Sequence, residues 1–83
     1  MQARYPNPHK VIVEVRADHK LDGRVIPRWF RPEDENKVVI DRILDIRQAA
    51  SLKAGGSGIR YICQVEGREV RLFHDEDKWF LEV

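Results

Sequence analysis

The stretch 58–83, GIRYICQVEGREVRLFHDEDKWFLEV, decides the fold. Apolar and polar residues alternate along it, as in half-buried strands, and the alternation breaks at Gly67-Arg68 and at residues 75–78. A glycine such as Gly67 suits the first central position of a type II′ hairpin turn, where φ is positive. The stretch therefore predicts a three-stranded antiparallel meander.

Counting outward from each turn gives the register of the two strands that it joins. A turn at Gly67-Arg68 predicts the pairs Val65–Val70, Gln64–Arg71, Cys63–Leu72 and Ile62–Phe73. A loop at residues 75–78 predicts the pairs His74–Trp79, Phe73–Phe80, Leu72–Leu81, Arg71–Glu82 and Val70–Val83. The two registers agree on the face of the sheet that each residue occupies, which supports the meander.

A second hairpin is predicted near the N-terminus. The residues from His9 to Asp18 alternate as a half-buried strand, and Asp22-Gly23 is a strong two-residue turn signal. Counting outward from this turn predicts the pairs Lys20–Val25, Arg16–Trp29, Val15–Phe30 and Glu14–Arg31. Pro27 cannot donate to a ladder, so the second strand is expected to be an edge strand or to bend there.

The segment 38–52 fits two structures. Its β-branched residues favour a strand over a helix, with a bulge or bend near residues 42–46, while residues 48–52 could form a helical turn. Residues 53–58, rich in glycine, are expected to form a mobile loop. Residues 1–8 contain Pro6 and Pro8 and are expected to form a flexible arm.

The fold class predicted from these segments is all-β. About six strands in residues 9–83 predict a single domain, built as a strongly bent antiparallel sheet or a partly open SH3-like barrel, because a flat sheet of this size leaves one face in water. The side chains expected on its inner face are Val11, Val13, Val15, Phe30, Ile40, Leu44, Tyr61, Cys63, Val65, Val70, Leu72, Trp79 and Leu81.

Composition excludes several protein classes. The chain has 83 residues, a net charge of +1 and one cysteine, so an intramolecular disulfide and a multi-cysteine zinc site are both excluded. No apolar run is long enough for a membrane span, and the first ten residues lack the apolar segment of a signal peptide. We therefore expect a cytoplasmic protein that does not contact a membrane.

No pattern of catalytic or cofactor-binding residues is present. Cys63 lies in the middle of a predicted strand on the apolar face, where a thiol is usually inert. The loop at residues 53–58 lacks the spacing of a phosphate-binding loop, and residues 74–77 lack the alternate spacing of calcium ligands. We expect neither an enzyme nor a bound metal or cofactor.

Two binding functions remain. The first is a protein-binding module, or a homodimer, that uses an apolar patch on the outer face of the meander, formed by Ile62, Phe73 and Phe80 with Arg71 on its rim. The alternative for these side chains is burial within a closed barrel. The second function is weak binding of single-stranded nucleic acid by the basic first hairpin, through Arg16, Lys20, Arg24, Arg28 and Trp29.

Three stretches carry a resemblance. Residues 23–30 (GRVIPRWF), 38–61 (VVIDRILDIRQAASLKAGGSGIRY) and 79–83 (WFLEV) resemble a family of small bacterial proteins of unknown function, associated with Gram-positive anaerobes. The resemblance implies a bacterial cytosolic β domain. It implies no catalytic or binding residue.

Overall fold

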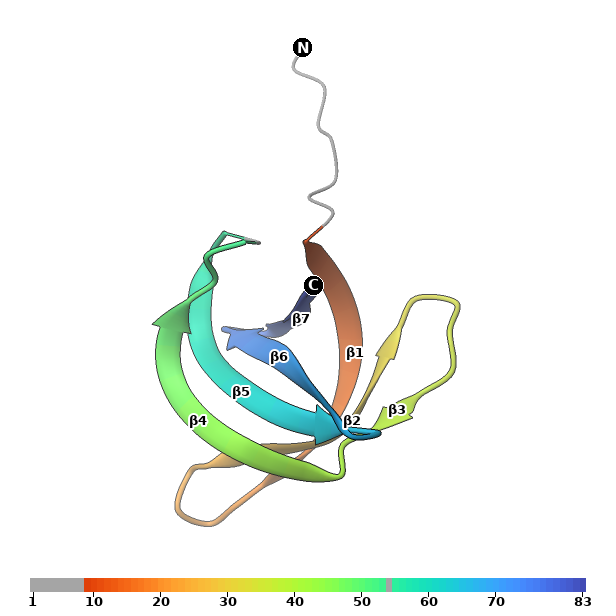
Figure 1. Ribbon diagram of the computed structural model, residues 1–83. Helices are drawn as coiled ribbons and strands as arrows, with labels where there is room; N and C mark the ends of the chain where they lie inside the picture. The colour runs from red at the N-terminus through yellow and green to blue at the C-terminus, as the bar shows by residue number, and fades with distance from the viewer. Residues whose placement is uncertain (1–8, 54) are drawn as a thin grey trace.

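The computed structural model of the protein describes residues 9–53 and 55–83, so the predicted arm at residues 1–8 lies outside the described residues. The fold is all-β, as predicted: one antiparallel sheet of seven strands curls into a half-barrel (Figure 1). The strands are β1 (Lys10–His19), β2 (Val25–Pro32), β3 (Val38–Val39), β4 (Arg42–Ala50), β5 (Ser57–Val65), β6 (Arg68–Asp75) and β7 (Lys78–Glu82). Their order across the sheet is β3-β2-β1-β7-β6-β5-β4.

The β1–β2 hairpin confirms most of the predicted register. The pairs Arg16–Trp29, Val15–Phe30 and Glu14–Arg31 are present. The predicted Lys20–Val25 pair is wrong, because the register shifts between Arg16 and Ala17 and His19 pairs with Val25 instead. Ala17 pairs with Pro27, which lacks a backbone N–H, so the irregularity falls where the proline interrupts the ladder.

The meander is confirmed, with one register corrected. All four pairs from Arg71–Glu82 to His74–Trp79 between β6 and β7 are as predicted. Between β5 and β6, however, Cys63 pairs with Val70, not with Leu72. The turn residues are Glu66 and Gly67, both with positive φ (50° and 76°), which is the type I′ geometry. The predicted register is therefore wrong by two residues, an even shift that leaves every residue on its predicted face.

The ambiguous segment forms strands, not a helix. It divides into β3 and β4, which raises the predicted six strands to seven. The alternative of a helical turn at residues 48–52 is not adopted, since residues 48–50 continue β4 in its ladder with β5. The predicted bulge is present between Ile43 and Asp45. It inserts Leu44 as an extra residue, so Leu44 is 42% exposed, contrary to prediction, and Ile43 packs against the core.

The main core lies on the concave face of the half-barrel. Its buried members are Val13, Phe30, Tyr61, Cys63, Val65, Leu72 and Leu81. The other predicted inner residues except Leu44 pack against this cluster while partly exposed: Val11, Val15, Ile40, Val70 and Trp79. Val38 and Ile43 join them.

One end of the half-barrel is closed by the connection between β3 and β4, the two edge strands. The Ile40 amide donates to the Arg28 carbonyl (2.9 Å) on one side of this connection. The Asp41 amide donates to the Gln64 carbonyl (2.9 Å) on the other. Because β3 has only two residues, this closure is short, and β2 and β4 diverge beyond it (Figure 1).

Candidate binding groove

The open side of the half-barrel lies between two strand edges. β3 pairs only with Trp29 and Phe30 of β2. Within the part of the chain that the structure describes, residues 25–27 therefore have a strand partner only on the β1 side. β4 is the outermost strand at the other end of the sheet. Strand edges of this kind can pair with a further strand.

An apolar groove of about 460 Å³ follows this open side. Two isoleucines line it while remaining partly exposed: Ile46 of β4 (43%) and Ile59 of β5 (36%). Tyr61 also lines the groove and is itself buried, and its hydroxyl donates to the Val25 carbonyl oxygen at 2.6 Å. The remaining lining residues are Gly23, Arg24, Val25, Ile26 and His74.

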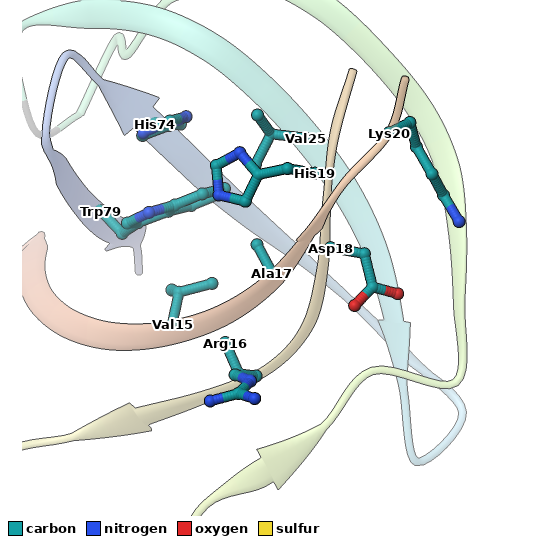
Figure 2. A pocket seen from close by; sticks show the side chains of 9 residues that line it. All are labelled: Val15, Arg16, Ala17, Asp18, His19, Lys20, Val25, His74 and Trp79. Atoms are coloured by element: carbon teal, nitrogen blue, oxygen red, sulfur yellow. The ribbon is translucent and has the colours of Figure 1, made fainter. Parts of the chain in front are cut away.

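A second depression, of about 740 Å³, shares Val25 and His74 with this groove. Figure 2 shows His19 beside Trp79, while Arg16, Asp18 and Lys20 point away to the other side of β1. The His74 and Trp79 rings stack with centroids 3.9 Å apart and planes at 3°. His74 therefore lies where the two depressions meet, with its ring stacked on Trp79.

The pKa of His74 lies below its ordinary value. Burial against Trp79 and its neighbours is the main cause, and the nearby His19 adds to it. A hydrogen bond with the Glu76 backbone and the charges of Asp75 and Asp77 oppose this shift. Burial thus favours the neutral form of His74, which suits a stacked position beside Trp79.

Of the predicted protein-binding patch, Phe73 and Phe80 are buried. Each is 1% exposed, and their rings stack with centroids 5.0 Å apart and planes at 3°, as a cluster separate from the main core. The expectation that a single-layer sheet leaves them in water is wrong. They are buried within the domain, as the alternative expects, although the half-barrel is not closed.

Polar side chains and a loop cover these rings on the convex face. The Lys10 Nζ atom lies 4.5 Å from the Phe80 ring centroid. Arg60, not Ile62, pairs with Phe73 because of the corrected β5–β6 register. The loop after β4 is tied down by hydrogen bonds to Glu82 Oε2 from the Ser51 hydroxyl (2.6 Å) and the Lys53 amide (3.2 Å).

The other two members of that patch pair with each other. Ile62 is half-buried and lies opposite Arg71, which is exposed. Arg71 lies opposite Glu82 on its other side, whereas Phe73 lies opposite Phe80. Charged side chains therefore occupy the positions that follow Ile62 across these ladders. The four residues thus form no continuous exposed apolar patch.

The predicted nucleic-acid face carries internal ion pairs. Arg24 pairs with Asp22 (2.8 Å) and Arg28 with Asp18 (2.6 Å). Arg31 pairs with Glu14, as predicted. These carboxylates offset much of the positive charge that phosphates would require.

The remaining members of this face lie on both strands of the hairpin. Trp29 is half-buried, and the Lys37 Nζ atom lies 5.5 Å from the centroid of its ring. Arg16 is exposed on the outer side of β1, and Lys20 is exposed directly after this strand. The hairpin thus brings the five residues to one region, but with acidic side chains between them.

Cys63 is fully buried, and burial raises the pKa of its thiol to about 11. A thiol with so high a pKa is a poor nucleophile at neutral pH. Among the described residues, no group of three or more potential metal ligands occurs. The same residues contain no helix that could cross a membrane.

Comparisons of the chain with protein-family models, curated proteins and solved structures give no match. The groove must therefore be interpreted from its own chemistry. Sequence reasoning placed Tyr61 in the core but missed Ile46 and Ile59 as surface residues. Their alternation marks both as facing inward, but only the separation of β2 from β4 leaves them accessible.

Proposed function

We propose that the protein is a non-catalytic, SH3-like interaction module that binds an extended segment of a partner polypeptide. The segment lies along the free edge of β4 and places its side chains in the apolar groove. The observation that carries this proposal is the position of the groove, between two strand edges on the open side of the half-barrel.

The backbone of β4 supplies the first part of the binding energy. An edge strand of nine residues presents N–H and C=O groups that an added strand can satisfy, which is the usual mode of strand addition to a sheet. Binding through backbone groups depends little on the partner's sequence. It therefore needs a second feature for selectivity.

The groove supplies that second feature. In an extended segment, alternate side chains point to the same face. On the inner side these side chains meet Ile46, Ile59 and the buried ring of Tyr61. The preferred segment is therefore one with apolar residues at alternate positions and polar residues between them.

A random peptide library displayed on phage and selected against the protein tests this function. We expect the selected peptides to alternate apolar and polar residues. We expect Ile46→Arg to weaken their binding by about tenfold or more, because it places a charge in the apolar groove. Binding should also slow amide exchange along β4, measured by NMR.

The matched control is Ile12→Arg, because Ile12 is also exposed (55%) but lies on β1 and does not line the groove. This variant should bind the peptides as the wild type does. If selected peptides bind equally well to Ile46→Arg, or if no alternating peptide is enriched, the groove is not the binding site. Thermal melts of both variants establish that each is folded.

Two further parts of the proposal rest on chemistry away from the groove. The buried, weakly acidic Cys63 supports a module without nucleophilic catalysis. A reducing compartment such as the cytosol suits a chain with a single cysteine. The resemblance to a bacterial protein family stays a prediction.

A further inference from the structure

We infer that the polypeptide that pairs with β4 is β4 of a second copy of this chain, so that two half-barrels join in one continuous sheet. This inference rests on the proposed function, since it uses the same free edge, and it names the partner. The argument comes from the charges along β4 and from the symmetry of a dimer.

A two-fold axis restricts how β4 can pair with itself. The two strands run antiparallel, and paired residues in a sheet point to the same face. Each residue must therefore lie opposite a residue whose side chain points to the same face. This condition holds only when the two-fold axis passes through a residue, not between two residues. The possible registers are then few, and each has one residue lying opposite its own copy.

The register centred on Ile46 places opposite charges together. Asp45 of each copy then lies opposite Arg47 of the other, and the two pairs are equivalent by symmetry. These pairs lie in the regular part of β4, which follows the bulge at Leu44. The two Ile46 side chains meet at the axis, on the face that lines the groove.

The neighbouring registers are unfavourable. An axis through Asp45 places two carboxylates opposite each other, and an axis through Arg47 places two guanidinium groups opposite each other. An axis through Leu44 falls on the bulge, and an axis through Gln48 pairs Arg47 with Ala49, so neither forms an ion pair between the copies. Of these registers, only the one centred on Ile46 forms ion pairs between the copies, and like charges oppose the two registers next to it.

Both charged side chains are available for this exchange of partners. In the single chain, Arg47 Nε lies 2.8 Å from Asp45 Oδ2, and the Arg47 side chain is 64% exposed. The Asp45 carboxylate also meets Arg60 at 3.5 Å. The side chains of Asp45 and Arg47 already point to the same face of β4. On dimerisation each can therefore exchange its partner within the chain for a partner in the second copy while β4 keeps its orientation.

Charge reversal provides the test. In Asp45→Arg, and separately in Arg47→Asp, both symmetric pairs become like-charged, so each variant alone should self-associate about tenfold more weakly than the wild type. Mixing the two variants makes both pairs complementary again. We therefore expect a heterodimer of wild-type strength, measured by sedimentation up to the highest soluble concentration.

Two controls complete the design. The double variant Asp45→Arg with Arg47→Asp should form a homodimer again, because its charges are exchanged in both chains. Glu35→Arg carries the same change of charge as Asp45→Arg on the exposed turn between β2 and β3, outside β4, and should associate as the wild type does. Thermal melts check that every variant is folded.

The inference is overturned if the wild type stays monomeric at every concentration, or if the two single variants fail to associate when mixed. Neither result affects the peptide selection, which tests the groove itself. Conversely, a dimer rescued by mixing, together with a failed peptide selection, would support the self-pairing and reject acceptance of other segments. The two proposals therefore fail separately.

Discussion

The hydroxyl of Tyr61 donates a hydrogen bond to the carbonyl oxygen of Val25 across the open side of the half-barrel, over 2.6 Å. Tyr61 belongs to β5 and Val25 begins β2, two strands that are not neighbours in the sheet. This bond satisfies a carbonyl at a free strand edge. It also holds the walls of the groove at a fixed separation.

Tyr61→Phe removes this bond while keeping the ring. We expect the free energy of unfolding to fall by about 0.5–1.5 kcal/mol, the usual net value of one hydrogen bond. Amide exchange at Arg24 and Ile26 should become faster, because the start of β2 loses its tie to β5. Denaturant titration and exchange measured by NMR check both effects; unchanged exchange at these amides would show that the bond does not hold the edge.

Phe80→Ala tests the second buried cluster. The ring is 1% exposed and stacked on Phe73, so its removal leaves a cavity and should lower the free energy of unfolding by about 3–5 kcal/mol. Ile12 pairs with Phe80 across the β1–β7 ladder but is 55% exposed, which makes Ile12→Ala the matched control with a small expected effect. Equal losses in thermal melts of the two variants would contradict the burial of Phe80.

Gly58→Ala tests a close approach of two strands. A Cβ atom at Gly58 would lie 2.4 Å from the His74 carbonyl oxygen, a backbone atom that cannot move aside cheaply. We expect a loss of about 1–3 kcal/mol in stability. The neighbouring Ser57→Ala, at an exposed position, should change little, and a stable Gly58→Ala would mean that β5 and β6 can separate there.

The lowered pKa of His74 predicts a dependence of stability on pH. The imidazole of His74 binds a proton less readily in the folded state than in the unfolded chain. The stability that neutral His74 contributes is therefore full above the ordinary pKa of 6.5 and is lost as the pH falls from 6.5 towards the lower pKa of the folded state. We expect the melting temperature to fall on acidification from neutral pH. In His74→Phe, which keeps a ring against Trp79, the fall over this range should be smaller; an identical fall would assign it to other groups.

The strand register could be predicted best where the sequence identifies the turn residues unambiguously. The acidic loop after Asp75 fixed the β6–β7 register, but the turn near Gly67 did not, because a glycine fits either central position of a hairpin turn. The choice depends on Glu66, which adopts a left-handed φ of 50° that a glutamate rarely takes. Because the register error was two residues, every side chain kept its predicted face of the sheet, and the core residues could still be predicted.

The remaining differences arise from tertiary structure. The alternation of residues 42–46 predicts a bulge but does not say that Leu44 is the inserted residue. The covering of Phe73 and Phe80 depends on Lys10 and on a loop held by Glu82, which are distant from both in the chain. The groove likewise exists only because the short β3 leaves β2 and β4 apart.

The order of strands in the sheet has a consequence for folding kinetics. β1 to β3 form one group and β4 to β7 another, and within each group every ladder joins strands that are consecutive in sequence. Among the described residues, the only ladder between the two groups is that of β1 with β7, from Lys10–Glu82 to Val13–Trp79, which joins opposite ends of the described chain. Closing so long a loop carries the largest entropy loss of any ladder. We expect the hairpins to form rapidly and the encounter of β1 with β7 to limit the rate at which the sheet assembles.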